Sequence, residues 1–471
     1  MSDFDLCVIG SGPAGQRAAI QAAKLGKRAV VVEKRDVVGG VAVNTGTIPS
    51  KALREAILAI VDRPAVMPKV EDFMAARNTT FTGLLSSCQK VISAEIDTIR
   101  SHFAHNGVET VHGLGRFKDE RTAVVDTATG LREITAKHFM VSTGTSPARP
   151  AEIPFDGTNV ITSDEILQLG YLPTSCIIVG GGVIGTEYAS MLQALGVRVT
   201  LVEGRHSLLG FVDEEITEAL QYHLRQAGMT IRFGEKVVKV EVLEPEGHAR
   251  TANGKMARAT LESGKTITAD CLLYAVGRQG CTAKLDLGNV DLEADHRGRL
   301  AVNEKYQTSK PHIYAAGDVI GFPALASTSM EQGRLAACHM FDVRAESFDL
   351  LLPYGIYSIP EISMVGWTEE KLTEEGIPYE SGVAQYREIA RGQILGDEIG
   401  MLKLLIHQES HQVLGVHVIG TGATELVHSG LAVAALKGTV EYFVNTVFNY
   451  PTLAECYKVA AYNGLNKLAS M

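Results

Sequence analysis

Short apolar runs that end in glycine alternate with amphipathic stretches along much of the chain. Residues 5–9 form one such run, and residues 176–179 form another in a closely similar setting. Each leads into a glycine-rich turn, a helical pattern, a Leu-Gly pair and a second apolar run that ends in an acidic residue. Apolar strands that alternate with helices are typical of βαβ units in a buried parallel sheet. The pattern therefore predicts an α/β fold that contains two such units.

Both glycine-rich turns have the spacing G-x-G-x-x-G, and each member of the second lies 170 positions after its counterpart. The members are Gly10, Gly12, Gly15 and the distal acid Glu33 in the first copy, and Gly180, Gly182, Gly185 and Glu203 in the second. In such a turn the first glycine permits the tight bend, the second admits a pyrophosphate and the third lets helix and strand pack closely. The acid accepts hydrogen bonds from ribose hydroxyls. Two copies predict two dinucleotide sites, which suits electron transfer between two bound nucleotides.

The hydrophobic pattern also predicts where the parts of the chain begin and end. Apolar residues recur at helical spacing from Phe81 to about His105, and an apolar strand that ends at Pro147 follows. A second closing strand ends at Gly280. Because both strands finish in glycine turns, we expect the chain to cross between domains there. The expected parts are residues 1–150, 151–280, 281–345 and 346–471.

The last part has a different pattern from the rest. Before it, the segment at residues 312–321 is expected to be an apolar strand that ends in Gly-Asp, and a helical run through Arg334 follows. Two further strands flank a turn at residues 408–411, which predicts a hairpin. Amphipathic helices follow, beginning near Thr424 and Thr452. We expect these elements to form a separate α+β domain.

Composition and charge narrow the class of protein. The 471 residues are 45% hydrophobic and 21% charged, with a net charge of −10, which argues against a nucleic-acid surface. The N-terminus has no secretory pattern, and no run approaches the roughly twenty apolar residues of a membrane span. Seven scattered cysteines without a C-x-x-C motif favour reduced thiols in a cytoplasmic protein. The histidines have no metal-ligand spacing, so no metal is expected.

Several longer motifs resemble those of the class I pyridine nucleotide-disulfide oxidoreductases, the family of dihydrolipoamide dehydrogenase and glutathione reductase. They occur in the family's order along the chain: GGVAVNTGTIPSKALREA, TGTSP, AVGR, HIYAAGDV and YPTLAE. The resemblance implies an FAD-binding domain in residues 1–150 and 281–345. It implies an NAD(P)-binding domain in residues 151–280 and a dimerisation domain in residues 346–471. A homodimer is therefore expected, with a larger homo-oligomer left open.

The resemblance also implies roles for individual residues. Lys51 and Glu187 match the family's ion pair beside the reactive nitrogen of the flavin, which makes them the expected catalytic residues. Asp318 is expected at the ribityl and phosphate region of FAD. The residues expected to bind FAD, NAD(H) or NADP(H) are Gly10, Gly12, Gly15, Glu33, Lys51, Gly144, Gly180, Gly182, Gly185, Glu203, Arg205, Gly277 and Asp318.

The thiol chemistry of that family is missing from this chain. The motif that carries two cysteines in the disulfide reductases has Ala42 and Thr47 instead, so no disulfide relay can operate. Tyr450 stands where the family has its acid/base histidine, and a tyrosine that titrates near pH ~10 is a poor proton shuttle at neutral pH.

With a nicotinamide site and no thiol relay, the pattern resembles that of the soluble, Si-specific NAD(P)+ transhydrogenases. Matching strings include TGTIPSKALR, GDVIGFPALAS, EYFVNT and FNYPT. The resemblance implies FAD-dependent hydride transfer from NADPH to NAD+, in ping-pong order through reduced flavin. Two alternatives stay open: an NADH oxidase or diaphorase that passes electrons to oxygen or a quinone, and an inactive FAD-binding paralogue that acts as a scaffold.

Opposing features of the sequence bear on NADP(H) binding. Glu203 favours a free ribose 2′-hydroxyl and repels a 2′-phosphate. Arg205 and His206 lie close enough in sequence to offset that charge, His206 only when protonated. The alternative is that both are solvated loop residues.

Overall fold

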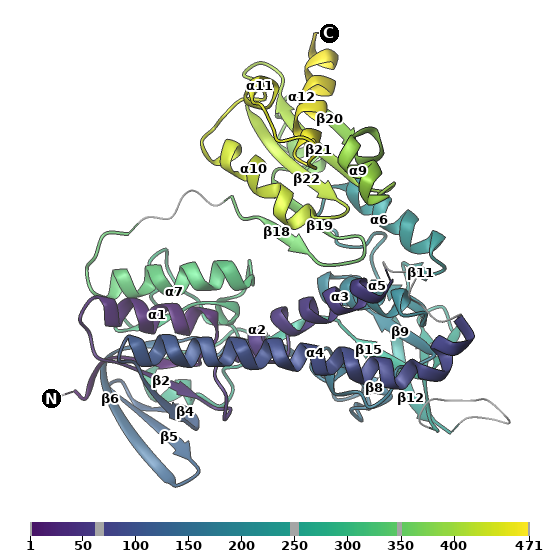
Figure 1. Cartoon of the computed structure of the whole chain (residues 1–471). Helices are drawn as coiled ribbons and strands as arrows, with labels where there is room; N and C mark the ends of the chain where they lie inside the picture. Colours follow the sequence, from purple (N-terminus) through teal and green to yellow (C-terminus); the bar gives the residue numbers. More distant parts are fainter. Residues whose placement is uncertain (1, 62–69, 245–253, 346–350, 470–471) are drawn as a thin grey trace. The chain divides into compact units, whose positions relative to one another are not determined.

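The computed structural model describes residues 2–61, 70–244, 254–345 and 351–469 (Figure 1). The chain forms two compact units. Unit 1 comprises Met1–Pro150, Ser163–Gly170 and Val276–Ser347, and unit 2 comprises Ala151–Thr162, Tyr171–Ala275 and Phe348–Met471. The first glycine turn lies in unit 1 and the second in unit 2. Each unit therefore holds one of the two predicted dinucleotide sites.

Unit 1 is built on a mixed sheet with the strand order β3-β2-β1-β6-β5-β4, in which β17 also pairs with β6. Its strands are β1 (Phe4–Ile9), β2 (Ala29–Glu33), β3 (Glu109–His112), β4 (Leu114–Asp119), β5 (Thr122–Thr127), β6 (Gly130–Val141) and β17 (Ile313–Ala315). Strands β3, β2, β1, β6 and β17 are parallel, while β4 and β5 are antiparallel. The buried β1 and β2 are almost wholly apolar, as parallel strands covered on both faces require.

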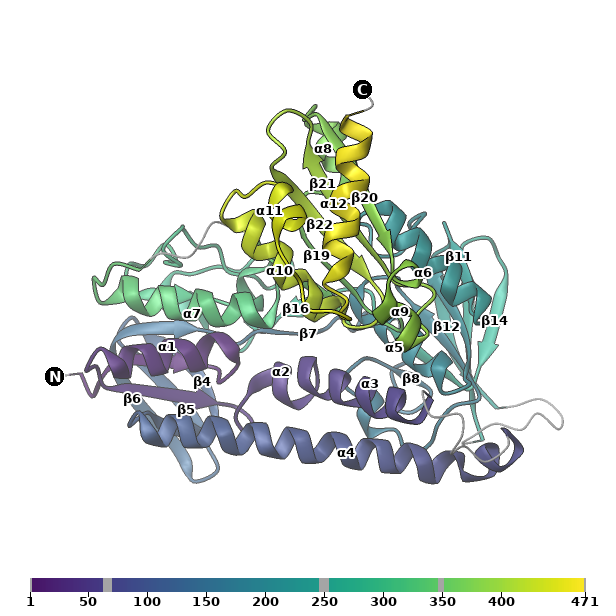
Figure 2. The ribbon, with the colours of Figure 1, turned by 45° about the horizontal axis from the view of Figure 1, so that its top comes forward.

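Helices cover one face of this sheet. Helix α1 (Pro13–Lys24) packs beside α7 (Ala326–Met340), and both share a core with the C-terminal half of α4 (Val70–His105) (Figure 2). Buried alanines on α1 allow this close approach, and Pro13 begins the helix at a position that needs no N–H donor. Short elements complete the unit: α2 (Gly40–Asn44), α3 (Thr47–Val61), β7 (Thr145–Pro147), β16 (Arg278–Gly280), η1 (Ile166–Gln168), η2 (Leu287–Val290) and η3 (Asp318–Ile320).

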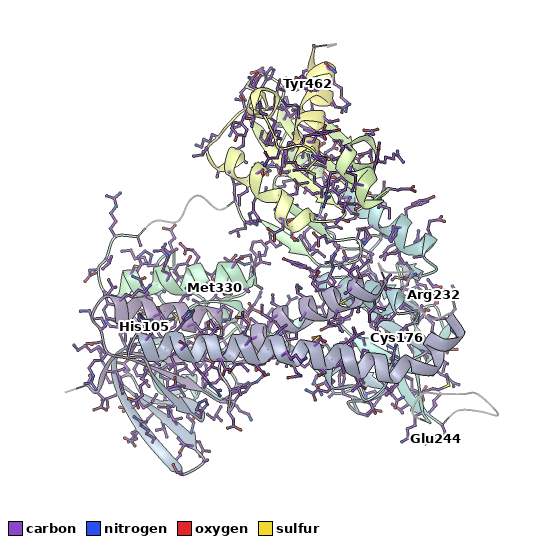
Figure 3. The ribbon with its side chains drawn as sticks, viewed as in Figure 1. His105, Cys176, Arg232, Glu244, Met330 and Tyr462 are labelled. Carbon is purple, nitrogen blue, oxygen red and sulfur yellow. The ribbon has the colours of Figure 1, made fainter. Side chains whose placement is uncertain are left out.

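Unit 2 contains a second parallel sheet, with the strand order β11-β10-β9-β15-β8. Its strands are β8 (Val160–Ile161), β9 (Ser175–Val179), β10 (Arg198–Glu203), β11 (Thr230–Phe233) and β15 (Cys271–Tyr274). Helices α5 (Val183–Ala194) and α6 (Glu214–Gln226) connect these strands. A separate antiparallel sheet consists of β12 (Val237–Leu243), β13 (Met256–Leu261) and β14 (Thr266–Ala269). Cys176, marked in Figure 3, lies in the apolar β9 and is buried.

The C-terminal part of unit 2 is an antiparallel sheet with the order β18-β19-β22-β21-β20. Its strands are β18 (Tyr354–Ile356), β19 (Ile362–Gly366), β20 (Tyr379–Gln385), β21 (Met401–His407) and β22 (Val413–Ile419). Its helical elements are α8 (Glu369–Glu374), η4 (Tyr386–Glu388), α9 (Ala390–Leu395), α10 (Ala423–Ala435), α11 (Glu441–Asn445) and α12 (Glu455–Leu468). Helices α10 and α12 share an apolar core with the sheet.

The structure confirms the predicted α/β class, the C-terminal hairpin and the helix expected from Phe81. That helix begins earlier, at Val70, and the run expected through Arg334 continues to Met340. The strands β4 and β5 and the β12–β14 sheet lie outside the elements predicted from the sequence. They are short antiparallel strands without a glycine fingerprint, so their local pattern is weak.

Candidate functional site

The first glycine turn joins β1 to α1 in a conformation that favours glycine. Gly10 has φ +107°, and a Cβ on Gly15 would lie 2.0 Å from the carbonyl oxygen of Gly10. At Gly12, in contrast, an added Cβ would meet no atom within 4 Å. Gly10 therefore allows the bend, and Gly15 allows the helix to pack closely on the strand. Gly12 leaves room for a bound group.

The second glycine turn joins β9 to α5 and repeats this geometry. Gly180 has φ +105°, and a Cβ on Gly185 would lie 1.9 Å from the carbonyl oxygen of Gly180. A Cβ added to Gly182 would again meet no atom within 4 Å. All six predicted glycines thus occupy the positions that a dinucleotide turn requires.

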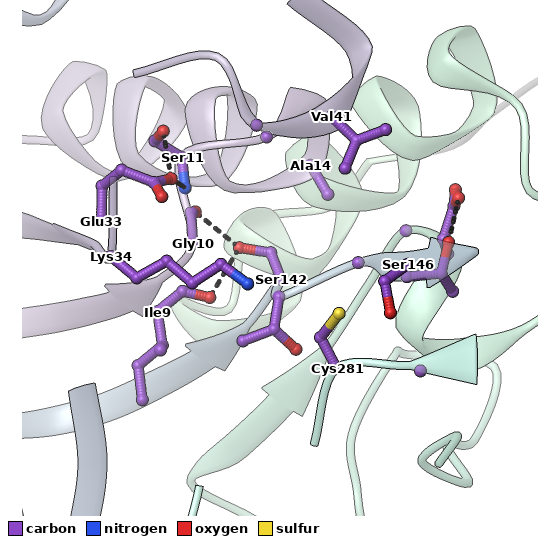
Figure 4. A pocket seen from close by; sticks show the side chains of 18 of the residues that line it. Ile9, Gly10, Ser11, Ala14, Glu33, Lys34, Val41, Ser142, Ser146 and Cys281 are labelled. Atoms are coloured by element: carbon purple, nitrogen blue, oxygen red, sulfur yellow. Dashed lines mark hydrogen bonds between the residues drawn. The ribbon is translucent and has the colours of Figure 1, made fainter. Parts of the chain in front are cut away.

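Glu33 ends β2 beside the first glycine turn, and its carboxylate is held by local donors (Figure 4). Its Oε2 accepts hydrogen bonds from the Ser11 amide at 3.0 Å and the Ser11 hydroxyl at 2.6 Å. Its Oε1 accepts the Arg35 amide at 3.0 Å. The side chain is buried, and these three donors fix its orientation.

Glu203 ends β10 beside the second turn and is held differently. Its Oε2 accepts the Gly181 amide at 2.6 Å, and its Oε1 accepts the Arg205 amide at 2.8 Å. The guanidinium of Arg205 adds two bonds, from Nε to Oε1 and from Nη2 to Oε2, each at 3.1 Å. Burial raises the pKa of Glu203, but the hydrogen bonds from Arg205 and Gly181 outweigh it and lower the pKa overall. Arg205 therefore neutralises the acid that would otherwise repel a 2′-phosphate.

Unit 1 contains a cavity of about 500 Å³ at the carboxyl ends of its parallel strands (Figure 4). The first glycine turn, Glu33, Lys34 and the residues that follow β6 and β17 line it. Gly144, with φ +65°, also lines the cavity and leaves open space where a side chain would stand. An open glycine surface at a helix N-terminus and a buried ribose acceptor fit the pyrophosphate and ribose of FAD.

Asp318 lies in this cavity wall at the start of η3. Its Oδ2 accepts a hydrogen bond from the Thr145 hydroxyl at 3.1 Å. Arg278 supports Thr145 with bonds to its hydroxyl at 2.7 Å and its carbonyl at 2.9 Å. Asp318 is predicted from the sequence but neither supporting residue is, although Thr145 belongs to the TGTSP motif and Arg278 to the AVGR motif. Gly277 lies next to Arg278 and is not among the residues that line the cavity.

Ala42 and Thr47 line the cavity at the positions of the two family cysteines. Neither side chain can form a thiolate. Cys281, for which the sequence carries no motif, also lines the cavity, after β16 (Figure 4). Tyr450 is 73% exposed in unit 2.

The two predicted catalytic residues lie in different units. Lys51 is half-buried on α3 in unit 1, and its ammonium donates to the Ser50 hydroxyl at 3.3 Å. It is not among the residues that line the cavity. Glu187 is buried on α5 in unit 2, where its Oε1 accepts the Tyr357 amide at 2.9 Å. That contact spans 170 positions, so no local sequence signal could have predicted it.

One acidic cluster in unit 2 has the arrangement of a cation site. Carboxylate oxygens of Asp213, Glu215 and Glu369 lie within 4.8 Å of one another. The ammonium of Lys403 pairs with all three, at 2.8 Å to Asp213 and 2.9 Å to Glu215. The lysine side chain is 1% exposed, so it supplies the positive charge that this cluster needs.

Two glycine turns with distal acids, each between parallel strands, define the class as dinucleotide-dependent oxidoreductases. The chain belongs to the pyridine nucleotide-disulphide oxidoreductase family, whose model matches residues 4–333. The dimerisation domain of the same family matches residues 352–461. The family match confirms the expected cofactor classes, a flavin and nicotinamide nucleotides. Among the described residues, no helix is both long and apolar enough to cross a membrane.

Named relatives resemble the chain over its whole length. A soluble pyridine nucleotide transhydrogenase of Mycobacterium bovis is 50% identical, covering 100% of this chain and 99% of the relative. Another, from Chromohalobacter salexigens, is 45% identical, covering 99% of each. LpdA from Mycobacterium tuberculosis has a similar fold, with a TM-score of 0.86 at 24% identity over 97% of this chain and 99% of that one.

Proposed function

We propose that the protein is an FAD-dependent transhydrogenase that transfers a hydride from NADPH to NAD+. The observation that carries the proposal is the pairing of two complete dinucleotide turns with Ala42 and Thr47 in place of the redox cysteines. A chain with this combination retains the means to exchange hydride with nicotinamide nucleotides but has no relay to a disulfide substrate. The 45% and 50% identity to named soluble pyridine nucleotide transhydrogenases supports the same conclusion.

In this proposal the cavity of unit 1 holds FAD. Gly12 and the N-terminus of α1 face the pyrophosphate, Glu33 accepts the adenosine ribose, and Asp318 binds the ribityl chain. FAD supplies hydride acceptance from one nicotinamide ring and hydride donation to another. The second turn, with Gly182 and Glu203, binds each nicotinamide nucleotide in turn.

The protein's own contribution is position and charge. Hydride transfer carries both electrons without a separate proton relay, so the exposed Tyr450 needs no acid/base role. We propose that Lys51 stabilises negative charge near the flavin and that Glu187 is the second catalytic residue, as the family resemblance implies. The amide of Tyr357 fixes one oxygen of Glu187, which orients the carboxylate for that role.

We further propose a cytoplasmic homodimer that binds no nucleic acid. The match of residues 352–461 to a dimerisation domain supports the dimer, and the scattered cysteines without a C-x-x-C motif favour a reducing compartment. The proposed functional parts are those expected from the sequence: residues 1–150 and 281–345 for FAD, 151–280 for NAD(P) and 346–471 for dimerisation. Light scattering of the holoprotein measures the oligomeric state, including any assembly larger than a dimer.

The function is tested with the FAD-loaded protein in the absence of oxygen. NADPH is supplied together with thio-NAD, whose reduced form absorbs at a distinct wavelength. Rapid formation of thio-NADH, with little turnover on lipoamide, is the expected result. Turnover that requires added quinone or oxygen would assign a diaphorase or oxidase instead, and no flavin reduction by either nucleotide would assign a scaffold.

A further inference from the structure

A cluster of cationic residues surrounds the acid of the second dinucleotide turn. Two loops meet there, one after β10 and one between β11 and β12. The Gly234 amide donates to the Arg205 carbonyl at 3.0 Å, and the Glu235 amide donates to the Glu203 carbonyl at 3.3 Å. These bonds fix the two loops side by side at the carboxyl edge of the sheet, where a nucleotide ribose binds in this fold.

Lys236 comes from the second of these loops and lies against the first. A Cβ on Gly204 would lie 3.4 Å from Lys236 Cγ and 3.8 Å from its Cε, so the lysine chain runs alongside Gly204. Gly204 separates Glu203 from Arg205 in the sequence, so Lys236 and Arg205 flank the same short segment. Both side chains are exposed and can reach a ligand. The neighbouring Glu235 is engaged elsewhere, because its Oε2 accepts the Ser263 amide.

The Glu203 carboxylate is fully occupied by its present donors. A carboxylate has about four acceptor positions, and Glu203 uses them for two amides and two guanidinium N–H groups. The Arg205 side chain is 55% exposed, and ion pairs with such an exposed partner contribute little net stability. A bound ribose hydroxyl or phosphate can therefore displace the guanidinium from the acid at small cost.

The second turn has no fixed side-chain donor like Ser11 of the first turn. The corresponding residue is Gly181, and a Cβ there would lie 2.6 Å from Leu208 Cδ2 and 3.0 Å from Glu203 Oε2. A side chain at this position would therefore have to displace its neighbours, and the side-chain donor to Glu203 is instead the guanidinium of Arg205.

We propose that Arg205 and Lys236 form a 2′-phosphate subsite that lets one ribose pocket accept both NADP(H) and NAD(H). With NADP(H), Arg205 turns from Glu203 to the 2′-phosphate, and Lys236 provides a second positive charge. With NAD(H), the 2′-hydroxyl donates to the Glu203 oxygen that the guanidinium leaves. This inference rests on the proposed function, because only a transhydrogenase needs both nucleotides at one site.

The test compares two probes that differ only in the phosphate, 2′,5′-ADP and 5′-AMP, by calorimetry on the FAD-loaded protein. Arg205→Ala and Lys236→Met are each expected to weaken 2′,5′-ADP relative to 5′-AMP by about tenfold, the contribution of one charged hydrogen bond. Arg205→Lys is expected to restore part of the preference. Lys239→Met is the matched control, because Lys239 pairs with Glu241 on β12 and should not change the ratio.

Kinetics separates this subsite from a general structural role. In Arg205→Ala the KM for NADPH is expected to rise while the KM for NADH falls, because Glu203 is then free for the ribose hydroxyl. A rise in both KM values, or an unchanged ratio of the two probe affinities in both variants, would overturn the subsite. The probe affinities are measured without turnover. If their ratio changes as expected while wild-type protein fails to form thio-NADH from NADPH, the proposed function fails and the subsite stands.

Discussion

The two dinucleotide turns share one backbone design, but the acids beside them have different neighbours. Glu33 accepts three hydrogen bonds, all from amides or from the short Ser11 side chain. Glu203 accepts four, two of them from the Arg205 guanidinium. The first acid therefore keeps one acceptor position for a ribose hydroxyl, whereas the second must exchange a donor before it can bind one. Under the proposed function, the first turn is a fixed cofactor site and the second an adjustable substrate site, and two or three side chains make the difference.

Substitution of Lys51 should have the strongest effect. In the proposed function this residue assists the hydride-transfer step itself, whereas the two glycine turns bind the nucleotides. Lys51→Ala is expected to slow flavin reduction by about 100-fold, because a preorganised charge near the reacting centre is lost. FAD should stay bound, because Gly12, Glu33 and Asp318, which are proposed to bind its pyrophosphate, ribose and ribityl chain, are unchanged. Rapid-mixing absorbance measures the reduction rate, with Lys90→Ala on α4 as the exposed-lysine control. Reduction at the wild-type rate would remove Lys51 from the mechanism.

Substitution of the third glycine in each turn should separate the two sites. Gly15→Ala and Gly185→Ala both place a Cβ within 2.0 Å of a backbone carbonyl oxygen, so helix and strand must move apart. Gly15→Ala is expected to weaken FAD binding, and Gly185→Ala to weaken nicotinamide nucleotides while the protein stays yellow. The expected loss is about 10- to 100-fold, which corresponds to ~1.4–2.8 kcal/mol and lies within the range that such overpacking costs.

Gly83→Ala is the control for these variants, because Gly83 is exposed on α4 and an added Cβ meets nothing within 4 Å. It should keep both affinities, and its melting temperature should not fall, because alanine is favoured over glycine inside a helix. If Gly185→Ala lost FAD as readily as Gly15→Ala, the assignment of one cofactor to each turn would be wrong.

Removal of the fixed donor of the first turn should have a smaller effect. Ser11→Ala removes the 2.6 Å hydroxyl bond to Glu33 and leaves that carboxylate less well oriented. FAD affinity, measured by reconstitution of the apoprotein, should fall by about three- to tenfold, or ~0.7–1.4 kcal/mol, because this hydrogen bond orients the acceptor and does not itself contact FAD. Ser87→Ala on α4, whose hydroxyl donates to a carbonyl of its own helix, is the control. Unchanged FAD affinity would show that Ser11 does not orient the ribose acceptor.

The pH should change nucleotide preference least of all. The pKa of Glu203 lies below its ordinary value of 4.5, and the pKa of Arg205 is raised further above neutrality. The ion pair is therefore complete above pH 4.5 and is lost only as the pH falls through the lower folded-state pKa of Glu203. The ratio of kcat/KM for NADPH to that for NADH should stay flat between about pH 6.5 and pH 8.5, outside the range where either residue titrates. A change of about tenfold there would contradict control by this pair.

Features that repeat locally could be predicted from the sequence. Glycine spacing identified both turns, and apolar runs that end in acids placed Glu33 and Glu203 correctly at the ends of β2 and β10. Hydrophobic periodicity located the helix from Phe81 and the C-terminal hairpin. These predictions are correct because the physical causes act within a few residues. The causes are backbone sterics and the burial of one face of an element.

Contacts between distant residues could not be predicted in this way. The sequence indicates Arg205 as a neighbour of Glu203 but cannot decide between a solvated loop residue and an ion pair, because that depends on side-chain rotamers. Lys236 has no sequence signal, because its approach to Gly204 requires the fold of two loops. The Lys403–Asp213 pair joins residues 190 positions apart and leaves no local pattern.

Hydride transfer between two nucleotides through FAD is examined most directly by observing the two half-reactions separately in the FAD-loaded protein without oxygen. We expect NADPH to bleach the visible flavin absorbance in a single turnover, and NAD+, added after removal of excess NADPH, to restore it. Both rates should be at least as fast as steady-state turnover. Bleaching by NADH alone, or a bleached flavin that NAD+ cannot restore while a quinone can, would contradict transfer between the two nucleotides.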